Sequence, residues 1–350
     1  MSKRKFILYC SRIFIGGGFN QLIEFLDKIN FDRYESIIYL DYRLKNNEIL
    51  QTHLNKFSKV KYIKNNFINF IIFDLIISYK YHKDDIIFCF ANLPLIFNLN
   101  KNVYLFIQNT LYLNNDIYKK KYFIKFFLFK KIIQYKIKTY CKIFVQTNLM
   151  KSTFLNNFNY DSNNIKILFF YYKDTLEKVE SQKIYPKYDF IYIADDAIHK
   201  NHKILIEVWK LLAKIKLYPT LILTVNKNSN LNIEIEKTNL KNKTKIYNYG
   251  HSDLNKIVSL LKESKCLIYP SLTESLGLPL IEANILNIPI IASDLNYVFE
   301  VCNPIETFNP FSAQSLYDVL IKYFDKKYNF IKLKKEYKYT EYKSLDKLIF

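Results

Sequence analysis

The sequence contains few of the residues from which disulfide frameworks and metal sites are built. Cysteine occurs only five times in 350 residues, irregularly spaced and mostly within apolar runs. No Cys-x-x-Cys pair or His/Cys cluster accompanies these residues. This pattern is typical of reduced core cysteines in a cytosolic protein, and it does not indicate zinc. The cysteines are Cys10, Cys89, Cys141, Cys266 and Cys302.

Long apolar runs are also absent. No stretch reaches the roughly 18 uninterrupted apolar residues that a membrane-spanning helix needs. The basic start Met1–Lys5 and the apolar run Phe6–Cys10 together look like a signal peptide. This apolar run is too short, however, and it leads directly into polar and glycine residues. We therefore expect a chain that is neither secreted nor membrane-spanning.

The length and the charge of the chain narrow the possibilities further. A chain of 350 residues is too long for one ordinary hydrophobic core, so two domains are expected. Hydrophobic residues make up 50% and charged residues 24%, which is ordinary for a soluble protein. The net charge of +20 is not ordinary. It predicts attraction to a polyanion, which could be nucleic acid, an anionic membrane surface or a phosphorylated substrate.

The stretch Cys266–Ala283 carries the most specific pattern in the chain. It predicts a short buried strand, Cys266–Tyr269, a polar loop that contains Glu274, and a helix that opens near Leu278. The free backbone N–H groups at such a helix start carry a partial positive charge and bind anions, phosphate above all. Gly277 would let a bulky ligand approach this backbone closely.

Two carboxylates bracket this candidate site, Glu274 before the turn and Glu282 one turn into the helix, in a Glu-x7-Glu pattern. The motif is preceded by Tyr269-Pro-Ser and followed by the run Ile288–Asp294. In this context the stretch resembles the retaining, nucleotide-sugar-dependent glycosyltransferases of the GT-B fold, the group 1 or family-four type. The resemblance implies an α/β protein with two Rossmann-like doubly wound domains that face each other across a cleft. The alternative is a solvated helix start with two surface acids.

The N-terminal residues predict the opening unit of a doubly wound α/β domain. An apolar strand, Phe6–Cys10, a glycine-containing loop and an amphipathic segment, Asn20–Ile29, follow one another. The loop is not a Gly-x-Gly-x-x-Gly fingerprint, so a nicotinamide cofactor is not indicated. The resemblance places Gly17 and Gly18 near the donor phosphates and the acceptor. The alternative is a tight turn without a ligand.

Further short apolar runs alternate with helical or irregular stretches, which predicts a parallel sheet covered on both faces. The candidate strands are Ser36–Leu40, Ile86–Phe90, Val103–Ile107 and Ile143–Gln146. Ligands of such sheets lie beyond the carboxyl ends of the strands, which directs attention to the loop Gln108–Thr110. Members of the resembled family often have a histidine there, near the donor sugar. Here Asn109 is the candidate, with an ordinary loop residue as the alternative.

The stretch from Tyr118 to Phe144 contains nine lysines and no acidic residue. On a helix, its aromatic and aliphatic residues would share one face. The opposite face would hold Lys120, Lys131, Lys138 and Lys142. A surface helix packed on the sheet explains part of this pattern. We also expect docking onto anionic lipid, with about 1 kcal/mol from each basic residue near such a surface. No recognisable nucleic-acid-binding module accompanies the charge, so nucleic acid is not the expected partner.

A polar segment, Tyr171–Lys187, is the expected linker to a second α/β domain. That domain opens with a strand at Phe190–Ile193, followed by a loop and a helix. The resemblance implies that this loop supplies an arginine and a lysine to the donor diphosphate. Lys200 matches the lysine, but Asp195 and Asp196 occupy the place of the arginine. His199 and His202 have no third partner, so they do not indicate a metal pair.

Three further predictions concern the second half of the chain. The resemblance places the nucleotide base at the ends of two strands, with Asn226 and Gly250 as candidates. The expected domain bounds are residues 1–175 for the acceptor side and residues 186–325 for the donor side. A C-terminal tail, residues 326–350, is expected to be helical and to cross back onto the first domain.

These residues imply a mechanism without a metal or another cofactor. The chain contains no Asp-x-Asp pair, so Lys200 and the amides near Gly277 and Leu278 would stabilise the diphosphate leaving group. From the resemblance, Glu274 would stabilise an oxocarbenium-like transition state or orient the sugar, and Glu282 would bind the ribose hydroxyls.

The expected enzyme is a retaining hexosyltransferase that moves a sugar from a nucleotide sugar to a saccharide or lipid-linked acceptor. Its expected place is cell-surface polysaccharide or lipopolysaccharide biosynthesis, peripherally on the inner face of the cytoplasmic membrane. The alternatives are a GT-B-related phosphorylase or epimerase, and a non-catalytic polyanion-binding protein.

Overall fold

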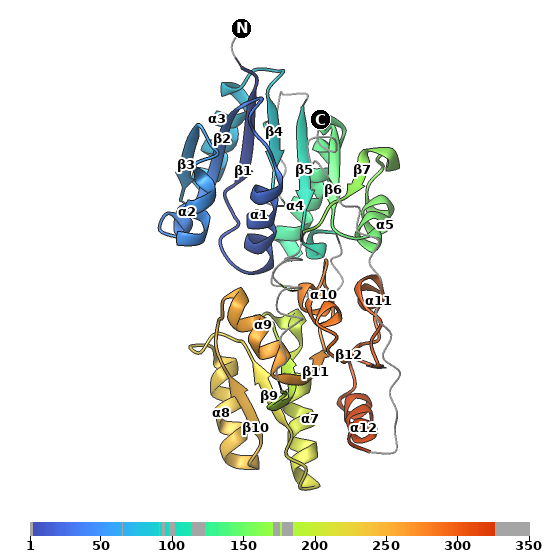
Figure 1. Ribbon diagram of the computed structural model, residues 1–350. Coiled ribbons are helices and arrows are strands. Elements are labelled where there is room, and N and C mark those ends of the chain that lie inside the picture. Colours follow the sequence, from blue (N-terminus) through green and yellow to red (C-terminus); the bar gives the residue numbers. More distant parts are fainter. Residues whose placement is uncertain are drawn as a thin grey trace. The chain divides into compact units, whose positions relative to one another are not determined.

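Two compact units make up the chain, and each is built around one parallel sheet covered by helices (Figure 1). The computed structural model describes residues 3–64, 66–90, 92, 95–97, 102–113, 123–170, 176 and 185–325. Residues 3–170 belong to the first unit and residues 185–325 to the second. The predicted bounds of the domains stay a prediction. The predicted helical tail, residues 326–350, and most of the predicted linker lie outside the described residues.

The first unit contains a seven-stranded sheet in the order β3-β2-β1-β4-β5-β6-β7, with every neighbouring pair parallel. The strands are β1 (Lys5–Cys10), β2 (Glu35–Asp41), β3 (Lys59–Ile63), β4 (Ile86–Cys89), β5 (Val103–Ile107), β6 (Lys142–Val145) and β7 (Ile165–Ile167). The helices are α1 (Gly16–Lys28), α2 (Glu48–Leu54), α3 (Phe67–Lys80), α4 (Phe123–Lys136) and α5 (Asn148–Asn157). The strand order reverses between β1 and β4, as in doubly wound folds.

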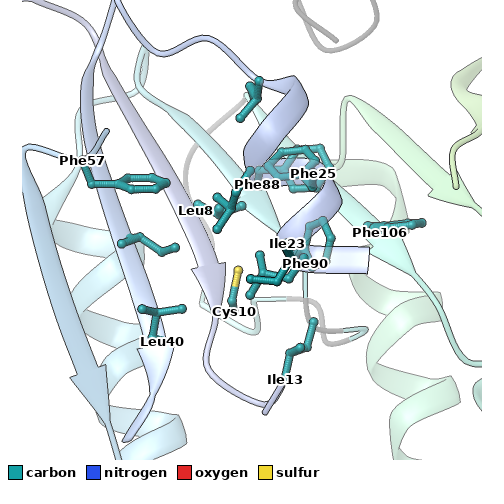
Figure 2. Close-up of a cluster of buried hydrophobic side chains, with 14 of the residues drawn as sticks. Leu8, Cys10, Ile13, Ile23, Phe25, Leu40, Phe57, Phe88, Phe90 and Phe106 are labelled. Carbon is teal, nitrogen blue, oxygen red and sulfur yellow. The ribbon is translucent and has the colours of Figure 1, made fainter. Parts of the chain in front are cut away.

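Alternate residues of β1 point into two separate cores, because successive side chains of a strand face opposite sides of the sheet. Phe6, Leu8 and Cys10 pack with side chains of α1 and α2 on one face. Figure 2 shows Leu8 and Cys10 of this cluster together with Ile23 and Phe25 of α1. Ile7 and Tyr9 pack with side chains of α3, α4 and α5 on the other. The sheet is therefore covered on both faces, and the buried β1 run has no polar alternation.

The second unit contains a six-stranded parallel sheet in the order β10-β9-β8-β11-β12-β13. Its strands are β8 (Tyr188–Tyr192), β9 (Thr220–Leu223), β10 (Lys245–Asn248), β11 (Ser264–Tyr269), β12 (Ile290–Ser293) and β13 (Glu306–Phe308). Its helices are α7 (His202–Lys214), α8 (Asn230–Asn242), α9 (Leu254–Lys262), α10 (Leu278–Ile285), α11 (Asn296–Val301) and α12 (Ala313–Phe324). The strand order again reverses, here between β8 and β11.

The single lysine-rich helix expected between Tyr118 and Phe144 is wrong in its extent. Helix α4 ends at Lys136, a 3₁₀ turn follows at Ile137–Thr139, and β6 begins at Lys142. Lys142 therefore lies on a strand and not on the polar face of a helix. The apolar run after it gains main-chain hydrogen bonds and burial by pairing with β5, which outweighs the helical pattern of the lysines.

Candidate active site

The end of β11 and the start of α10 form the candidate site in the second unit. Gly277 is the residue before α10 and has a φ of +69°, in the left-handed region that glycine adopts without strain. A Cβ atom at this position would lie 3.1 Å from Leu280 Cδ1. The Gly277 carbonyl accepts from the Leu280 amide at 2.9 Å, so the first turn of α10 closes directly on this glycine. Leu278 is the first residue of the helix, as predicted.

Lys200 and Glu274 meet beside this turn. The Lys200 Nζ atom donates to both Glu274 carboxylate oxygens, at 2.7 Å to Oε1 and 2.9 Å to Oε2. Two hydroxyls also donate to Glu274 Oε1, from Tyr269 at 3.0 Å and from Ser271 at 2.7 Å. The Lys200 and Glu274 side chains are only 16% and 10% exposed, so the pair is largely withdrawn from water.

Several hydrogen bonds hold the two loops of this pair together. The Tyr192 hydroxyl lies 2.8 Å from both the Lys200 carbonyl and Ser271 Oγ. The Leu272 amide donates to the His199 carbonyl at 2.8 Å. Asn201, in left-handed conformation with a φ of 57°, donates from Nδ2 to the Pro270 carbonyl at 3.2 Å. The positions of the ammonium and the carboxylate are therefore fixed by the backbone around them.

The ionisation of the site follows from its surroundings. Burial raises the pKa of Glu274. The Lys200 ammonium and the hydrogen bonds from Lys200 and Ser271 lower this pKa by more than burial raises it, so the net shift is downward. Burial lowers the pKa of His199, and Lys200 adds to this effect. Burial also lowers the pKa of His202 to about 3. These shifts favour an ionised Glu274 carboxylate and two neutral imidazoles at neutral pH.

Glu282 has a different environment from Glu274. It lies in α10, is only 4% exposed, and its carboxylate has no hydrogen-bond partner within the described part of the chain. Burial alone raises its pKa to about 7. A buried carboxylate without a partner is costly for the fold, so its surroundings favour a ligand that donates hydrogen bonds to it.

Two more predicted residues lie together at the carboxyl ends of neighbouring strands. Asn226 follows β9 and Gly250 follows β10. Asn226 Oδ1 accepts from the Asn228 amide at 2.9 Å, so this oxygen shapes its own turn. Gly250 has a φ of +79°, and a Cβ atom there would lie 3.1 Å from Cε of Lys227. Lys227 is a cation at this edge that the sequence did not single out, although it directly follows Asn226.

Asp195 and Asp196 occupy the place of the expected arginine, and a local hydrogen bond explains the first of them. Asp195 Oδ1 accepts from the Ala197 amide at 3.2 Å, which closes the turn before Lys200. This capping role needs a short acceptor side chain, which arginine lacks.

In the first unit, Gly17 and Gly18 lie in the first turn of α1, after the carboxyl end of β1. A Cβ atom at Gly18 would lie 3.5 Å from Gln108 Oε1. Gln108 Nε2 donates to the Phe90 carbonyl at 2.9 Å, whereas its Oε1 atom is buried and accepts no hydrogen bond from a described residue. The neighbouring candidate Asn109 accepts from the Leu111 amide at 2.9 Å and so caps a 3₁₀ turn. The sequence pointed to this loop, but the side chain with an unused acceptor is Gln108.

The predicted lysine surface is only partly described. Lys120 and the side chain of Lys138 lie outside the described residues, whereas Lys131 is exposed on α4 and Lys142 is half-buried on β6. Among the residues that the structure describes, no cluster of three or more His, Cys, Asp or Glu side chains is arranged to hold a metal ion. The described helices also include none with the length and hydropathy to cross a membrane.

Residues 174–343 match the family model described as glycosyl transferases group 1. This matched segment belongs to the group 1 glycosyltransferases. The resemblance to this family, inferred from the sequence around Glu274 and Glu282, is thus confirmed. A search of curated proteins found no match.

Solved structures resemble this chain over almost its whole length. Anabaena HepE in complex with UDP and glucose is 13% identical, with 93% of this chain and 91% of that chain covered and a TM-score of 0.64. Sucrose-phosphate synthase from Thermosynechococcus elongatus is 13% identical, with 92% and 90% covered and a TM-score of 0.65. A glycosyltransferase from Rickettsia africae is 17% identical, with 91% and 87% covered and a TM-score of 0.58. The predicted GT-B fold, with two Rossmann-like units, is confirmed.

Proposed function

We propose that this protein transfers a hexose from a nucleotide-sugar donor with retention of anomeric configuration and without a metal ion. The observation that carries this proposal is the buried pair of Lys200 and Glu274 beside the start of α10. Donors of this class leave as diphosphates, so the departing group needs positive charge. The Lys200 ammonium and the amides after Gly277 supply it, which is why no cofactor is part of the proposal.

Glu274 acts on the sugar in this proposal. Its ionised carboxylate stabilises positive charge on an oxocarbenium-like transition state or accepts hydrogen bonds from sugar hydroxyls. The hydroxyls of Tyr269 and Ser271 hold the carboxylate in place, so it needs no reorganisation during transfer. Retention is proposed from the family to which the matched half of the chain belongs.

The nucleotide occupies the same unit. The Glu282 carboxylate, buried and without a partner among the described residues, accepts hydrogen bonds from the ribose hydroxyls. Asn226 and Gly250 contact the base at the ends of β9 and β10. Anabaena HepE was solved with UDP and glucose, which supports a uridine nucleotide as the first donor to test. Gly17 and Gly18, in the first unit, are proposed to contact the donor phosphates and the acceptor.

The acceptor is a saccharide or a lipid-linked saccharide of cell-surface polysaccharide or lipopolysaccharide biosynthesis. The protein works peripherally on the inner face of the cytoplasmic membrane in this proposal. Its net charge of +20 and the exposed residues Phe127, Leu128 and Lys131 of α4 support contact with an anionic surface.

The donor is tested first by thermal unfolding of the full chain with a panel of nucleotide sugars, because a bound ligand raises stability by mass action. The stabilising donor, radiolabelled in its sugar, is then tested for transfer to a glycan fraction. The variants Lys200→Ala and Glu274→Gln should lose transfer, whereas Lys265→Ala should keep it. Lys265 forms an ion pair with Asp189 at 2.8 Å in the same unit, and its own side chain is 54% exposed.

The outcome of this assay separates the alternatives. If the protein forms a sugar phosphate from inorganic phosphate, its activity is phosphorolysis and not transfer. If it forms an epimer of the sugar, its activity is epimerisation. Normal biological activity of Lys200→Ala and Glu274→Gln would instead indicate a non-catalytic polyanion-binding protein.

A further inference from the structure

Helix α3 of the first unit exposes a continuous row of large apolar side chains. Ile68, Ile72, Ile76 and Tyr79 are 68%, 45%, 37% and 67% exposed. Their spacing of four, four and three residues places them on one side of the helix, and we call this row the α3 stripe. A helix of a globular domain normally turns its polar residues outward, so an outward apolar row indicates a partner surface.

The opposite side of α3 is anchored, so the stripe cannot turn inward. Asp74 is fully buried and accepts from the backbone amides of Ile96 at 2.7 Å and Phe97 at 3.1 Å. Ser78 Oγ also donates to Asp74, at 3.3 Å, and Ile77 packs in the core of the sheet. Rotation of the helix would break these bonds and expose Ile77. The outward direction of the stripe is therefore fixed by the fold.

Lysines border the stripe at both ends. Lys64 precedes the helix, and Lys80 ends it directly after Tyr79. Lys61, on β3, lies close enough to Lys80 for their amines to interact, and burial and this neighbour both lower the pKa of Lys61. Lys59 adds further positive charge, although its own ammonium pairs with Glu35 at 2.9 Å. Two ammonium groups held together in this way attract an anion.

We propose that the α3 stripe inserts into the interface of an anionic bilayer while Lys64, Lys61 and Lys80 bind the lipid phosphates. A second copy of the chain fits this surface poorly, because each copy carries a net charge of +20 and would bring the same lysines together. An anionic lipid surface complements both the apolar row and its basic border.

The position of α4 also supports an anionic bilayer as the partner of this surface. Helices α3 and α4 cover the same face of the sheet, since Ile77 and Ile133 share one core. Helix α4 exposes Phe127 and Leu128 on its outer side. This inference rests on the membrane contact proposed above for α4 and extends it to α3, which the sequence pattern did not indicate.

The test uses the purified full chain and flotation with vesicles of phosphatidylcholine and phosphatidylglycerol, or of phosphatidylcholine alone, at low and high salt. We expect flotation only with the anionic vesicles at low salt. In the double variant Ile68→Asp/Ile72→Asp, the fraction of protein that floats with these vesicles should fall at least about tenfold. The control Ile233→Asp/Leu240→Asp makes the same change at exposed positions of α8, where the side chains are 48% and 85% exposed, and should float like the unmodified protein.

The lysines are tested separately. Lys61→Ala and Lys80→Ala should each weaken binding by about fivefold, the equivalent of about 1 kcal/mol for each basic residue at such a surface. Circular dichroism and stabilisation by the donor nucleotide sugar should stay unchanged in all these variants, which shows that they fold.

Three results would overturn the proposal. They are equal flotation of the stripe variant and the control, equal binding to neutral vesicles, and a concentration-dependent dimer that the stripe variant abolishes. If the unmodified protein is not stabilised by any donor and transfers no sugar, the result counts against the proposed enzyme activity and not against this surface. The two proposals therefore fail in different experiments.

Discussion

Lys200 and Glu274 lie 74 positions apart in the sequence, yet the ammonium of one contacts both carboxylate oxygens of the other. Because both side chains are largely buried, removal of either partner leaves a desolvated charge without its counterion. Breaking such a pair costs roughly 3–5 kcal/mol. We expect Lys200→Ala to lower the free energy of unfolding by about 3 kcal/mol and to reduce sugar transfer by 100-fold or more.

The more exposed pair of Lys265 and Asp189 provides the control for this prediction. The Lys265 side chain is 54% exposed, so its ion pair is screened by water. Lys265→Ala should lower the free energy of unfolding by less than about 1 kcal/mol and leave transfer unchanged. Urea unfolding and a transfer assay compare the two variants, and equal effects would contradict the assigned importance of Lys200.

A second prediction concerns stability in acid. Burial raises the pKa of Glu274, but Lys200 and the hydrogen bonds lower it below its ordinary value of 4.5 in the folded protein. The unfolded chain therefore takes up this proton at a higher pH than the folded chain. The stabilisation is present above the ordinary pKa and is lost as the pH falls through the folded pKa.

Glu274→Gln removes this titration. Below about pH 5, the free energy of unfolding should consequently fall more steeply in the unmodified protein than in the variant. Urea unfolding at several pH values between neutral and acid measures both slopes. Parallel curves would show that Glu274 has the same pKa in the folded and unfolded states.

The strands that the sequence predicted and those that it missed differ in one physical respect. The predicted strands include the buried centre of each sheet, such as β1 and β11, whose short but uninterrupted apolar runs are evident in the sequence. The strands for which the sequence predicted no bounds are β3, β7, β10 and β13, and these are the edge strands of the two sheets. In β10 only Ile246 is buried. A half-exposed edge strand leaves little apolar pattern to recognise.

The candidate site shows a similar division. The resemblance brought together Lys200 and Glu274, and the loop rule reached the segment that contains Gln108 and Asn109. Sequence alone could not tell which of these two side-chain amide oxygens would accept a hydrogen bond from its own turn. That depends on the turn geometry after β5, where Asn109 caps the Leu111 amide. Likewise, the sequence predicted a strand from Ile143, but the helical spacing of the lysines hid that this strand begins at Lys142.

A third prediction concerns the backbone at Gly277. Its φ of +69° lies in the left-handed region, where a residue with a Cβ atom is strained by roughly 1–2 kcal/mol. Gly277→Ala should therefore destabilise the protein by this amount and weaken the stabilisation by the donor. Asparagine tolerates this region better than alanine does.

Gly277→Asn is the matched variant, because both substitutions add a Cβ atom near Leu280 and differ in their tolerance of a positive φ. Gly277→Asn should be the more stable of the two in thermal unfolding. Equal losses would indicate that the contact with Leu280, and not the backbone conformation, sets the cost.

The last prediction separates stability from binding at Glu282. Burial raises the pKa of Glu282 from its ordinary value of 4.5 to about 7, so the folded chain keeps a proton that the unfolded chain has lost between these values. Stability from this group is thus complete below about pH 4.5 and is lost as the pH rises through 7. Glu282→Gln does not ionise, and it should be more stable than the unmodified protein at pH 8, by an amount on the order of 3 kcal/mol.

This gain should disappear near pH 4, and it should be accompanied by weaker donor stabilisation because a neutral amide accepts hydrogen bonds from ribose hydroxyls less strongly than a carboxylate. Glu207→Gln, on the exposed face of α7, is the control and should change neither property. Urea unfolding at both pH values and a donor titration test the pair. A Glu282→Gln variant that is less stable at pH 8 would mean that the carboxylate is satisfied within the folded chain, and its assignment to the donor ribose would then lose its physical basis.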